Sequence, residues 1–217
     1  MTTADRFTPN ASGAVWQPSL VSREQRWADA GVEGVTVWLT GLSGSGKSAI
    51  ADLVLAKMTS LGTTAYVLDA DNLRHGLNSD LGFSPDDRME NCRRVAEVAH
   101  LFADAGVTCI VPIISPYASD RCRARRRHEE EGLRFVEVFV DTPLEICIAR
   151  DPKGLYRRAL AGDITEFTGI SAPYEEPEHP ELHLRTEGVE PAVLADRVIA
   201  AITARSGVGN RAETRAP

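Results

Sequence analysis

The residues whose types and spacing most clearly point to chemistry form the stretch Gly41-Leu-Ser-Gly-Ser-Gly-Lys-Ser48. It matches the phosphate-loop (P-loop) pattern G-x-x-x-x-G-K-[ST]. Glycines adopt positive φ and leave room beside the backbone, so successive N–H groups can converge on phosphate oxygens. In this pattern Lys47 reaches the β- and γ-phosphates of a nucleotide and the Ser48 hydroxyl is a ligand of Mg²⁺. The stretch predicts a nucleoside triphosphate site; the alternative is a glycine turn that matches by accident.

Two acids follow a second predicted strand, residues 63–68. Ligands lie at the carboxyl ends of strands in open parallel sheets, and residues i and i+2 of a strand face the same side. We therefore assign Asp69 to the Mg²⁺ shell, through water, and Asp71 to orienting or deprotonating an acceptor hydroxyl. Two alternatives remain: the acids exchange these roles, or they form only a turn or a helix cap.

Strands alternating with helices position these groups. The β-branched, apolar run at 35–39 has the composition of a buried parallel strand. Ser84 is a predicted N-cap, with Pro85 at the first helical position. The other predicted strands are 63–68, 107–114, 134–140 and 182–184, and the predicted helices are 21–30, 49–58, 85–105, 119–131, 146–150 and 191–204. This alternation predicts an α/β fold of the P-loop NTPase type, a doubly wound parallel sheet with helices on both faces.

Length and composition fit one globular domain, because the chain has 217 residues of which 43% are hydrophobic and 25% charged. We expect one domain at 34–204. Residues 1–33 are expected to form an N-terminal arm that packs on the core or on a second subunit, with a disordered leader as the alternative. The tail, 205–217, is expected to be disordered.

Charge and apolar patterning exclude several classes of function. The net charge of −7 argues against wholesale nucleic-acid binding. No apolar run approaches the ~20 residues that a membrane span needs, and no secretory signal is visible. The four cysteines form no C-x-x-C pair, which is typical of reduced, mostly buried thiols. We expect a cytoplasmic protein without nucleic-acid or membrane partners.

Arginine is much more frequent than lysine in this chain. Only three of the 24 lysines and arginines are lysines, so a retained lysine is expected to serve as a compact ammonium. Besides Lys47, this makes Lys153 a candidate. The charged run 121–131 differs, because Arg126 with Glu130 and Arg127 with Glu131 are spaced i,i+4. We interpret that run as a solvated helix face.

Taken together, the motifs resemble the adenylylsulfate (APS) kinases of the sulfate-activation pathway. The resemblance covers residues 14–185. It rests on six blocks in order: Gly41-Leu-Ser-Gly-Ser-Gly-Lys-Ser48, Asp69-Ala-Asp-Asn-Leu-Arg-His-Gly-Leu-Asn78, Leu81-Gly-Phe-Ser84, Ile114-Ser-Pro-Tyr117, Arg150-Asp-Pro-Lys-Gly-Leu-Tyr156 and Phe167-Thr-Gly-Ile170. It implies a kinase, usually dimeric, that moves the γ-phosphate of ATP to the ribose 3′-hydroxyl of APS with Mg²⁺, giving PAPS. A separate sulfate adenylyltransferase is a further expected partner.

The resemblance also implies that 34–204 is a P-loop kinase domain with a mobile lid at about 150–175, and it implies roles for individual residues. The ATP site comprises Gly41, Leu42, Ser43, Gly44, Ser45, Gly46, Lys47, Ser48 and Arg150. The APS site comprises Asp71, Arg74, Phe83, Arg88, Asn91, Ile114, Ser115, Lys153, Leu155 and Phe167. Guanidinium forks suit the charged oxygens of a sulfate–phosphate anhydride. Phe83 and Phe167 are expected to sandwich the adenine, because both lie in polar, glycine-flanked loops where core packing is harder.

Ser115 is a candidate phosphoserine, because this serine is described as a phosphorylated intermediate in some family members. A hydrogen-bonding role fits its position equally well. The chain departs from the family pattern at Ala70, where glycine is common, and at Thr165 and Ser171 in the lid. Two rival interpretations are a P-loop kinase acting on another small nucleotide or alcohol, and a non-catalytic nucleotide sensor.

Overall fold

A computed structural model describes residue 15 and residues 17–204. Within these residues the strands form one five-stranded sheet in the order β2-β3-β1-β4-β5. Every neighbouring pair of strands is parallel. The strands are β1 (Val35–Thr40), β2 (Ala65–Val67), β3 (Thr108–Pro112), β4 (Arg134–Asp141) and β5 (Leu182–Arg185). The predicted α/β class and doubly wound parallel sheet are confirmed.

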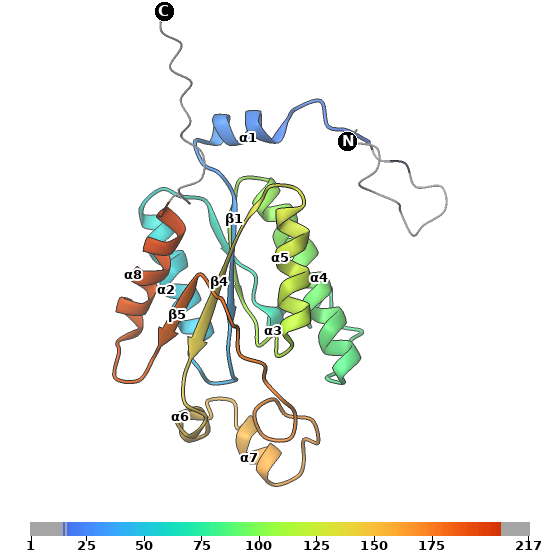
Figure 1. Ribbon diagram of the computed structural model, residues 1–217, viewed down its shortest axis with the longest axis vertical. Coiled ribbons are helices and arrows are strands. Elements are labelled where there is room, and N and C mark those ends of the chain that lie inside the picture. The colour runs from blue at the N-terminus through green and yellow to red at the C-terminus, as the bar shows by residue number, and fades with distance from the viewer. Residues whose placement is uncertain (1–14, 16, 205–217) are drawn as a thin grey trace, which may run out of the picture.

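Helices cover both faces of the sheet, as Figure 1 shows, with α2 and α8 on one face and α4 and α5 on the other. The short helices α6 and α7 lie beyond the carboxyl ends of the strands, and α1 lies at the opposite end. The helices are α1 (Arg23–Ala30), α2 (Lys47–Ser60), α3 (Ala70–Leu73), α4 (Pro85–Asp104), α5 (Ala118–Glu129), α6 (Leu144–Arg150), α7 (Leu155–Leu160) and α8 (Pro191–Thr203). The predicted tail at 205–217 lies outside the described residues.

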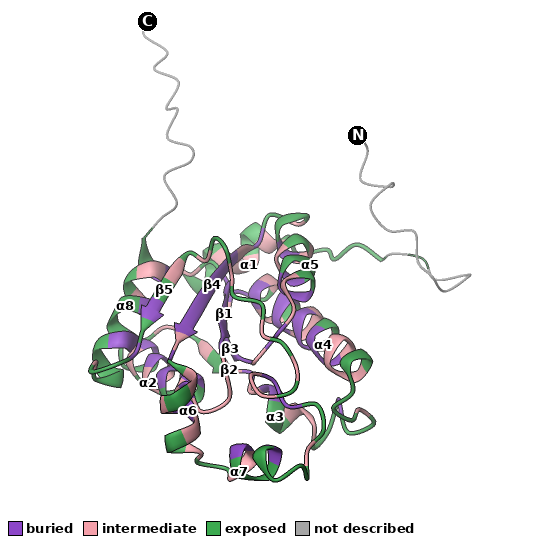
Figure 2. Cartoon of the chain, turned by 60° about the horizontal axis from the view of Figure 1, so that its bottom comes forward, coloured by how far each residue is buried: buried purple, intermediate pink, exposed green. Residues whose placement is uncertain are grey.

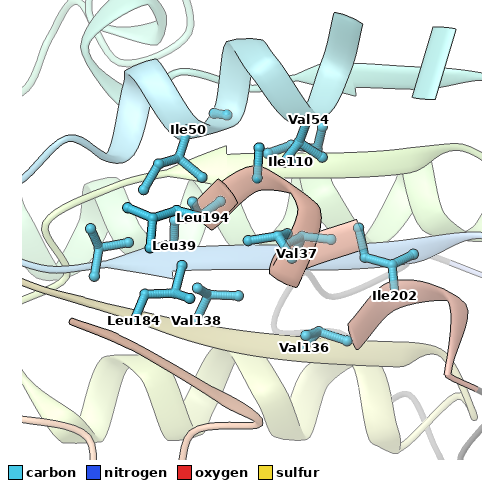
Figure 3. Packing of buried hydrophobic residues seen from close by; sticks show 14 of the residues in the cluster. Val37, Leu39, Ile50, Val54, Ile110, Val136, Val138, Leu184, Leu194 and Ile202 are labelled. Carbon is cyan, nitrogen blue, oxygen red and sulfur yellow. The ribbon is translucent and has the colours of Figure 1, made fainter. Parts of the chain in front are cut away.

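The central strands are buried on both faces, which explains their apolar composition. Along β1 the side chains of Val37 and Leu39 pack on the α2 and α8 side, while Trp38 packs on the α4 and α5 side. Figure 3 shows the first of these clusters, where Ile50 and Val54 of α2 meet the strands. Figure 2 shows burial concentrated in the sheet and on the inward helix faces. The core thus fixes the strand ends from which the candidate residues project.

Local signals set several element boundaries. The predicted start of α4 is confirmed: the Ser84 hydroxyl accepts a hydrogen bond from the Asp87 amide at 3.2 Å, and Pro85 opens the helix. Strand β2 is shorter than the predicted 63–68, because only 65–67 pair with β3. The sequence analysis did not predict α3 or α7, whose few residues carry too little periodicity to register.

Helix α1 packs against the core at the end of the sheet that lacks the phosphate loop. Arg23 donates to an Asp104 carboxylate oxygen at 2.6 Å, and the Trp27 indole donates to the Asp104 carbonyl at 3.1 Å. Arg26 also pairs with Asp104. Trp27 lies beside Gly106, where an added Cβ would come within 3.2 Å of the indole. The division of the chain into arm, domain and tail remains a prediction.

The prediction that residues 121–131 form a solvated helix face is wrong for Arg121, Ala124 and His128, which are buried. The physical reason is that one face of α5 packs on the sheet, where Arg121 pairs with Glu137 at 2.9 Å. The predicted pair of Arg127 with Glu131 is present at 2.7 Å. Charge spacing alone therefore did not reveal which arginine the fold buries.

Three of the cysteines, Cys92, Cys109 and Cys147, are buried free thiols, and Cys122 is exposed. Across residues 15 and 17–204, no helix combines the length and the apolar character that a membrane crossing requires.

Candidate active site

The phosphate loop joins β1 to α2 at the carboxyl edge of the sheet. Its glycines take backbone conformations that other residues rarely adopt, with φ of 148° at Gly41, 72° at Gly44 and 103° at Gly46. At Gly41 an added Cβ would lie 2.5 Å from the Val140 carbonyl oxygen. The loop therefore passes β4 at a separation that only glycine permits, and α2 starts at its end with free backbone N–H groups.

Lys47 is held inside this loop. It is 8% exposed, and its ammonium donates to the carbonyl oxygens of Gly41 at 2.9 Å and Leu42 at 2.6 Å. Burial lowers the pKa of Lys47 from 10.5 to about 8, because the charged form loses hydration. A phosphate chain in the loop would restore a counter-charge to this ammonium.

The two acids lie at the start of α3, which corrects the prediction that they share one face of a strand. Asp69 is the N-cap of this helix and accepts from the amides of Asp71 at 2.9 Å and Asn72 at 3.1 Å. Asp69 thus caps a helix, as the alternative proposed, but the cap occupies only one of its two carboxylate oxygens. Its other carboxylate oxygen accepts from the Ser48 hydroxyl at 3.3 Å. The Asp71 carboxylate is exposed and pairs with the Lys153 ammonium of the lid segment.

The segment predicted as a lid folds back on the phosphate loop. Arg150 donates to the Gly44 carbonyl at 3.4 Å, and the Tyr156 hydroxyl donates to the Ser43 carbonyl at 2.9 Å. Gly169 lies against Leu42, since an added Cβ would come within 3.0 Å of its side chain. A hollow of 490 Å³ beside the loop is lined by Leu42, residues 169–174 and Glu176.

Three of the predicted acceptor-binding residues meet between α3 and α4. The Arg74 guanidinium lies 4.4 Å from the ring centroid of Phe83 and donates to the Gly82 carbonyl at 2.7 Å. Arg88 donates to the Phe83 carbonyl at 2.8 Å and reaches across to Thr168 of the lid at 2.5 Å.

Asn91 is also on α4, but it is buried and accepts from the Asn78 amide at 3.0 Å. It therefore holds the loop between α3 and α4, while Arg74 and Arg88 are only partly covered. Leu155, at the start of α7, packs at the edge of the cluster formed by Cys147, Tyr156, Ala159 and Phe167.

The two phenylalanines have different environments. Phe83 is 65% exposed, as expected of a residue available for stacking. Phe167 is 8% exposed and meets the Tyr156 ring edge-to-face, with centroids 4.9 Å apart. The expectation that a glycine-flanked loop disfavours core packing is therefore wrong for Phe167, because Phe167 packs in a small apolar cluster with Tyr156 and Ala159 of α7 and Cys147 of α6. The stacking roles themselves remain predictions.

Ser115 follows β3 in a left-handed conformation, with φ of 40°, and is 1% exposed. Its hydroxyl accepts from the Trp38 indole at 3.1 Å and donates to the Thr40 hydroxyl at 2.9 Å. Thr40 in turn donates to the Ile114 carbonyl at 2.7 Å. This environment favours the hydrogen-bonding role of Ser115 over the phosphorylated intermediate, because the hydroxyl is enclosed and both donates and accepts.

The sequence analysis missed two side chains that hold the phosphate loop. The Thr142 hydroxyl donates to the Ser45 carbonyl at 2.9 Å and bonds the Thr186 hydroxyl at 2.5 Å. The other side chain is that of Tyr156, whose hydroxyl donates to the Ser43 carbonyl. Thr142 and Thr186 each follow a strand at the carboxyl edge, and that position was the signal available for finding them.

Ser48 and Asp69 fit a magnesium ion that arrives with a nucleotide. Both offer oxygen, the ligand atom that Mg²⁺ prefers, and their side chains are in contact at 3.3 Å. In the described part of the chain no three His, Cys, Asp or Glu side chains gather as a metal-binding group. Such a pair matches an ion held largely by phosphate oxygens and water.

Known proteins share these features over most of the chain. The sequence model of a family described as adenylylsulphate kinase matches residues 33–185. The adenylyl-sulfate kinase of Saccharomyces cerevisiae is 55% identical over 177 residues, which is 82% of this chain and 87% of that protein. The bifunctional enzyme NodQ of Rhizobium tropici is 55% identical over 185 residues, 85% of this chain, but the chain spans only 29% of its length.

A solved structure is similar as well. The APS kinase CysC of Mycobacterium tuberculosis, in complex with AMPPNP and APS, is 54% identical with a TM-score of 0.77. The match covers 79% of this chain and 98% of that one.

Proposed function

The chain belongs to the adenylylsulfate kinase family, and we propose how its residues share the work of that reaction. As an adenylylsulfate kinase it transfers a phosphoryl group from ATP to APS, giving PAPS and ADP. One observation carries the proposed division of roles. The phosphate loop, the Asp69 cap and the pair of Asp71 with Lys153 all lie at one edge of the sheet, under one lid.

Positioning and charge neutralisation supply most of the catalysis, because the transition state of phosphoryl transfer is loose. We assign Lys47 and the loop amides to the phosphates of ATP, with Arg150 of the lid beside them. Asp71 orients the ribose 3′-hydroxyl and takes its proton as the oxygen attacks the γ-phosphorus. Lys153, already paired with Asp71, adds positive charge there when the lid is closed.

Mg²⁺ is assigned to Ser48 and, through water, to Asp69. When bound it neutralises charge on the β- and γ-phosphate oxygens. The support for this assignment is the contact of a hydroxyl with a carboxylate at the start of α2, where a triphosphate would lie. The N-cap bonds to Asp69 fix its carboxylate before any ligand arrives.

The acceptor is placed between α4 and the lid. Arg74 and Arg88 are assigned to the charged oxygens of APS, and Phe83 to its adenine with Phe167 on the opposite side. Asn91 is buried and is assigned an indirect role, because its side chain holds the loop between α3 and α4 by accepting a hydrogen bond from Asn78. The transfer is direct and Ser115 acts as a hydrogen-bonding residue, since its hydroxyl is enclosed.

We further propose that the chain works as a homodimer and receives APS from a separate sulfate adenylyltransferase. The support for a partner enzyme is the relative NodQ, in which the matching region is part of a longer, bifunctional protein.

The lowered pKa of Lys47 predicts that nucleotide binding takes up a proton. At pH 8 about half of the Lys47 side chains are neutral, and a polyphosphate favours the charged form, so about 0.5 proton is taken up for each ATP bound. Titration calorimetry of ATP binding in buffers of different ionisation enthalpy measures this number. At pH 6, where Lys47 is already protonated, the uptake assigned to it falls to zero; equal uptake at both pH values contradicts the assignment.

The exposed ring of Phe83 provides a test of the acceptor side. Phe83→Ala removes a stacking surface worth about 1–3 kcal/mol per base, so the KM for APS should rise about fivefold or more while the KM for ATP stays within twofold. Steady-state kinetics with each substrate varied in turn makes the measurement. Leu101→Ala, at another exposed apolar side chain, is the control. An equal rise in both KM values removes Phe83 from the acceptor pocket.

Acceptor choice distinguishes this function from that of a P-loop kinase acting on another small alcohol or nucleotide. ADP release is measured in a coupled assay with APS, AMP, adenosine and simple sugars as acceptors. We expect kcat/KM for APS to exceed that for the others by at least about 10³, because the arginines should be left with unpaired charges when the sulfate is missing. Comparable turnover of AMP or a sugar contradicts the assignment.

A further inference from the structure

Hydrogen bonds between hydroxyl groups connect the last residues of the lid, at Tyr174, to the end of β1, at Thr40. Thr40, the last residue of β1, directly precedes Gly41 of the phosphate loop and is fully buried. Its single proton goes to the Ile114 carbonyl at 2.7 Å. The Tyr174 hydroxyl, 2.9 Å from the Thr40 oxygen, must therefore be the donor in that contact.

Ser115 completes the set by donating to the same Thr40 oxygen at 2.9 Å. Thr40 thus uses its one proton and both of its lone pairs, so the direction of each hydrogen bond is fixed. Removing the Tyr174 hydroxyl leaves one lone pair of a buried oxygen without its donor, which is costly.

Arg121 ties the same segment from the side of α5. Its side chain is buried. Two of its nitrogens donate hydrogen bonds, to the Ser115 carbonyl at 2.7 Å and the Glu175 carbonyl at 2.7 Å, and the third makes an ion pair with the Glu137 carboxylate at 2.9 Å. Only the fixed fork of an arginine reaches all three partners at once. Glu175 adds two contacts, from its own amide to the Pro116 carbonyl at 2.8 Å and from the Ala118 amide to its carboxylate at 2.7 Å.

We propose that Tyr174 and Glu175 form a fixed anchor of the lid, and that Tyr174 and Arg121 are positioning residues for the acceptor substrate. The anchor confines lid movement to the residues before Tyr174. It also fixes the distance between the phosphate loop and residues 166–172, called the strip below, because Tyr174 is hydrogen-bonded to Thr40, the residue immediately before that loop. Figure 1 shows this strip in orange, between α7 and β5.

The strip that the anchor holds is the one expected to touch the acceptor. Its backbone receives a hydrogen bond from Arg88 at Glu166, Gly169 rests on Leu42, and residues 169–174 line the 490 Å³ hollow. ATP phosphates are assigned to the amides of the phosphate loop itself, which Arg150 and Tyr156 contact at Gly44 and Ser43. Loosening the anchor should therefore affect the acceptor more than ATP. This inference rests on the proposed acceptor side between α4 and the lid.

Tyr174→Phe tests the anchor with the loss of a single oxygen atom. We expect the KM for APS to rise about fivefold, the factor that one net hydrogen bond is worth in an equilibrium constant, and the KM for ATP to stay within twofold. The matched control is Tyr66→Phe, at an exposed tyrosine on the edge strand β2. Unchanged KM values, or an equal rise in both, overturn the positioning role, because a merely structural hydroxyl would not separate the two substrates.

Hydrogen exchange gives a second readout that does not depend on which substrate is bound. The amides of Glu175 and Ala118 donate within the anchor, so both should exchange faster in Tyr174→Phe than in the parent protein, with amides of α8 unchanged. Unchanged exchange at both sites refutes the anchor itself. If exchange rises while Phe83→Ala affects both substrates equally, the anchor stands and the acceptor placement fails.

Arg121→Lys addresses the second residue without removing its charge. A lysine ammonium cannot contact Ser115, Glu175 and Glu137 together, so the variant should raise the KM for APS and leave the KM for ATP within twofold, as is expected of Tyr174→Phe. Arg123→Lys, on the exposed face of the same helix, is the control. A stable Arg121→Lys protein with parent KM values overturns the role of Arg121.

Discussion

Lys47→Ala is expected to lower kcat by about 10³-fold, the upper end of the effect of removing one preorganised charge donor from a reacting group. The ammonium lies inside the phosphate loop, held by the Gly41 and Leu42 carbonyls, so its position is set before ATP binds. Alanine removes the charge and leaves the loop backbone, whose shape depends on its glycines. Steady-state kinetics with saturating APS measures the loss.

Lys57→Ala is the matched control, because Lys57 lies on the same helix and pairs with Asp196 at the surface. It should leave kcat within twofold. Thermal unfolding of both variants separates a catalytic loss from a folding defect, and we expect Lys47→Ala to be no less stable than the parent, since it removes a buried charge. A kcat within tenfold of the parent value would show that Lys47 does not carry the charge stabilisation assigned to it.

Asp71→Asn is expected to lower kcat by about 10²–10⁴, the usual contribution of a positioned general base. The amide keeps the size of the carboxylate and the start of α3, because the helix is capped by Asp69. It cannot take the proton of the 3′-hydroxyl. Rapid-quench measurement of the first turnover isolates the chemical step from product release.

Lys153→Met decides between two explanations of that loss. Asp71 is assigned to the acceptor hydroxyl and also pairs with Lys153, so its replacement should change both the chemical step and the contact with the lid segment. If the ion pair alone matters, Lys153→Met should match Asp71→Asn. We expect Lys153→Met to be less severe by at least about tenfold, because the base remains. Asp196→Asn, an exposed acid on α8, serves as the control. Equal losses in the two site variants remove the base role from Asp71.

The sequence predicted those parts of the molecule that depend on local pattern. A glycine-rich turn between a β-branched strand and an apolar helix has one well-understood geometry, so the helix after the phosphate loop was predicted, although α2 begins at Lys47 and not at residue 49. The start of α4 was equally local, since Ser84 and Pro85 cap a helix by themselves. Alternating strands and helices then left little choice of sheet.

Tertiary packing decided the remaining features, and no spacing in the sequence reveals it. Asp69 caps a helix of four residues and Asp71 lies in it, and a helix so short shows no period, so both acids were placed on a strand. Phe167 and Arg121 lie in polar stretches, yet partners distant in the sequence bury both: Tyr156 meets the ring and Glu137 the guanidinium. The candidate site was thus predicted by residue type and sheet edge, while its contacts required the structure.

Transfer of label from [γ-³²P]ATP to two APS analogues shows which hydroxyl of APS accepts the phosphoryl group. In the proposed site the ribose 3′-oxygen, and no other hydroxyl, lies opposite the γ-phosphorus held by Lys47. We therefore expect labelled product with 2′-deoxy-APS, in which the 3′-hydroxyl remains, and none above background with 3′-deoxy-APS. Labelled product from 3′-deoxy-APS at a rate comparable to that from APS would rule out this assignment.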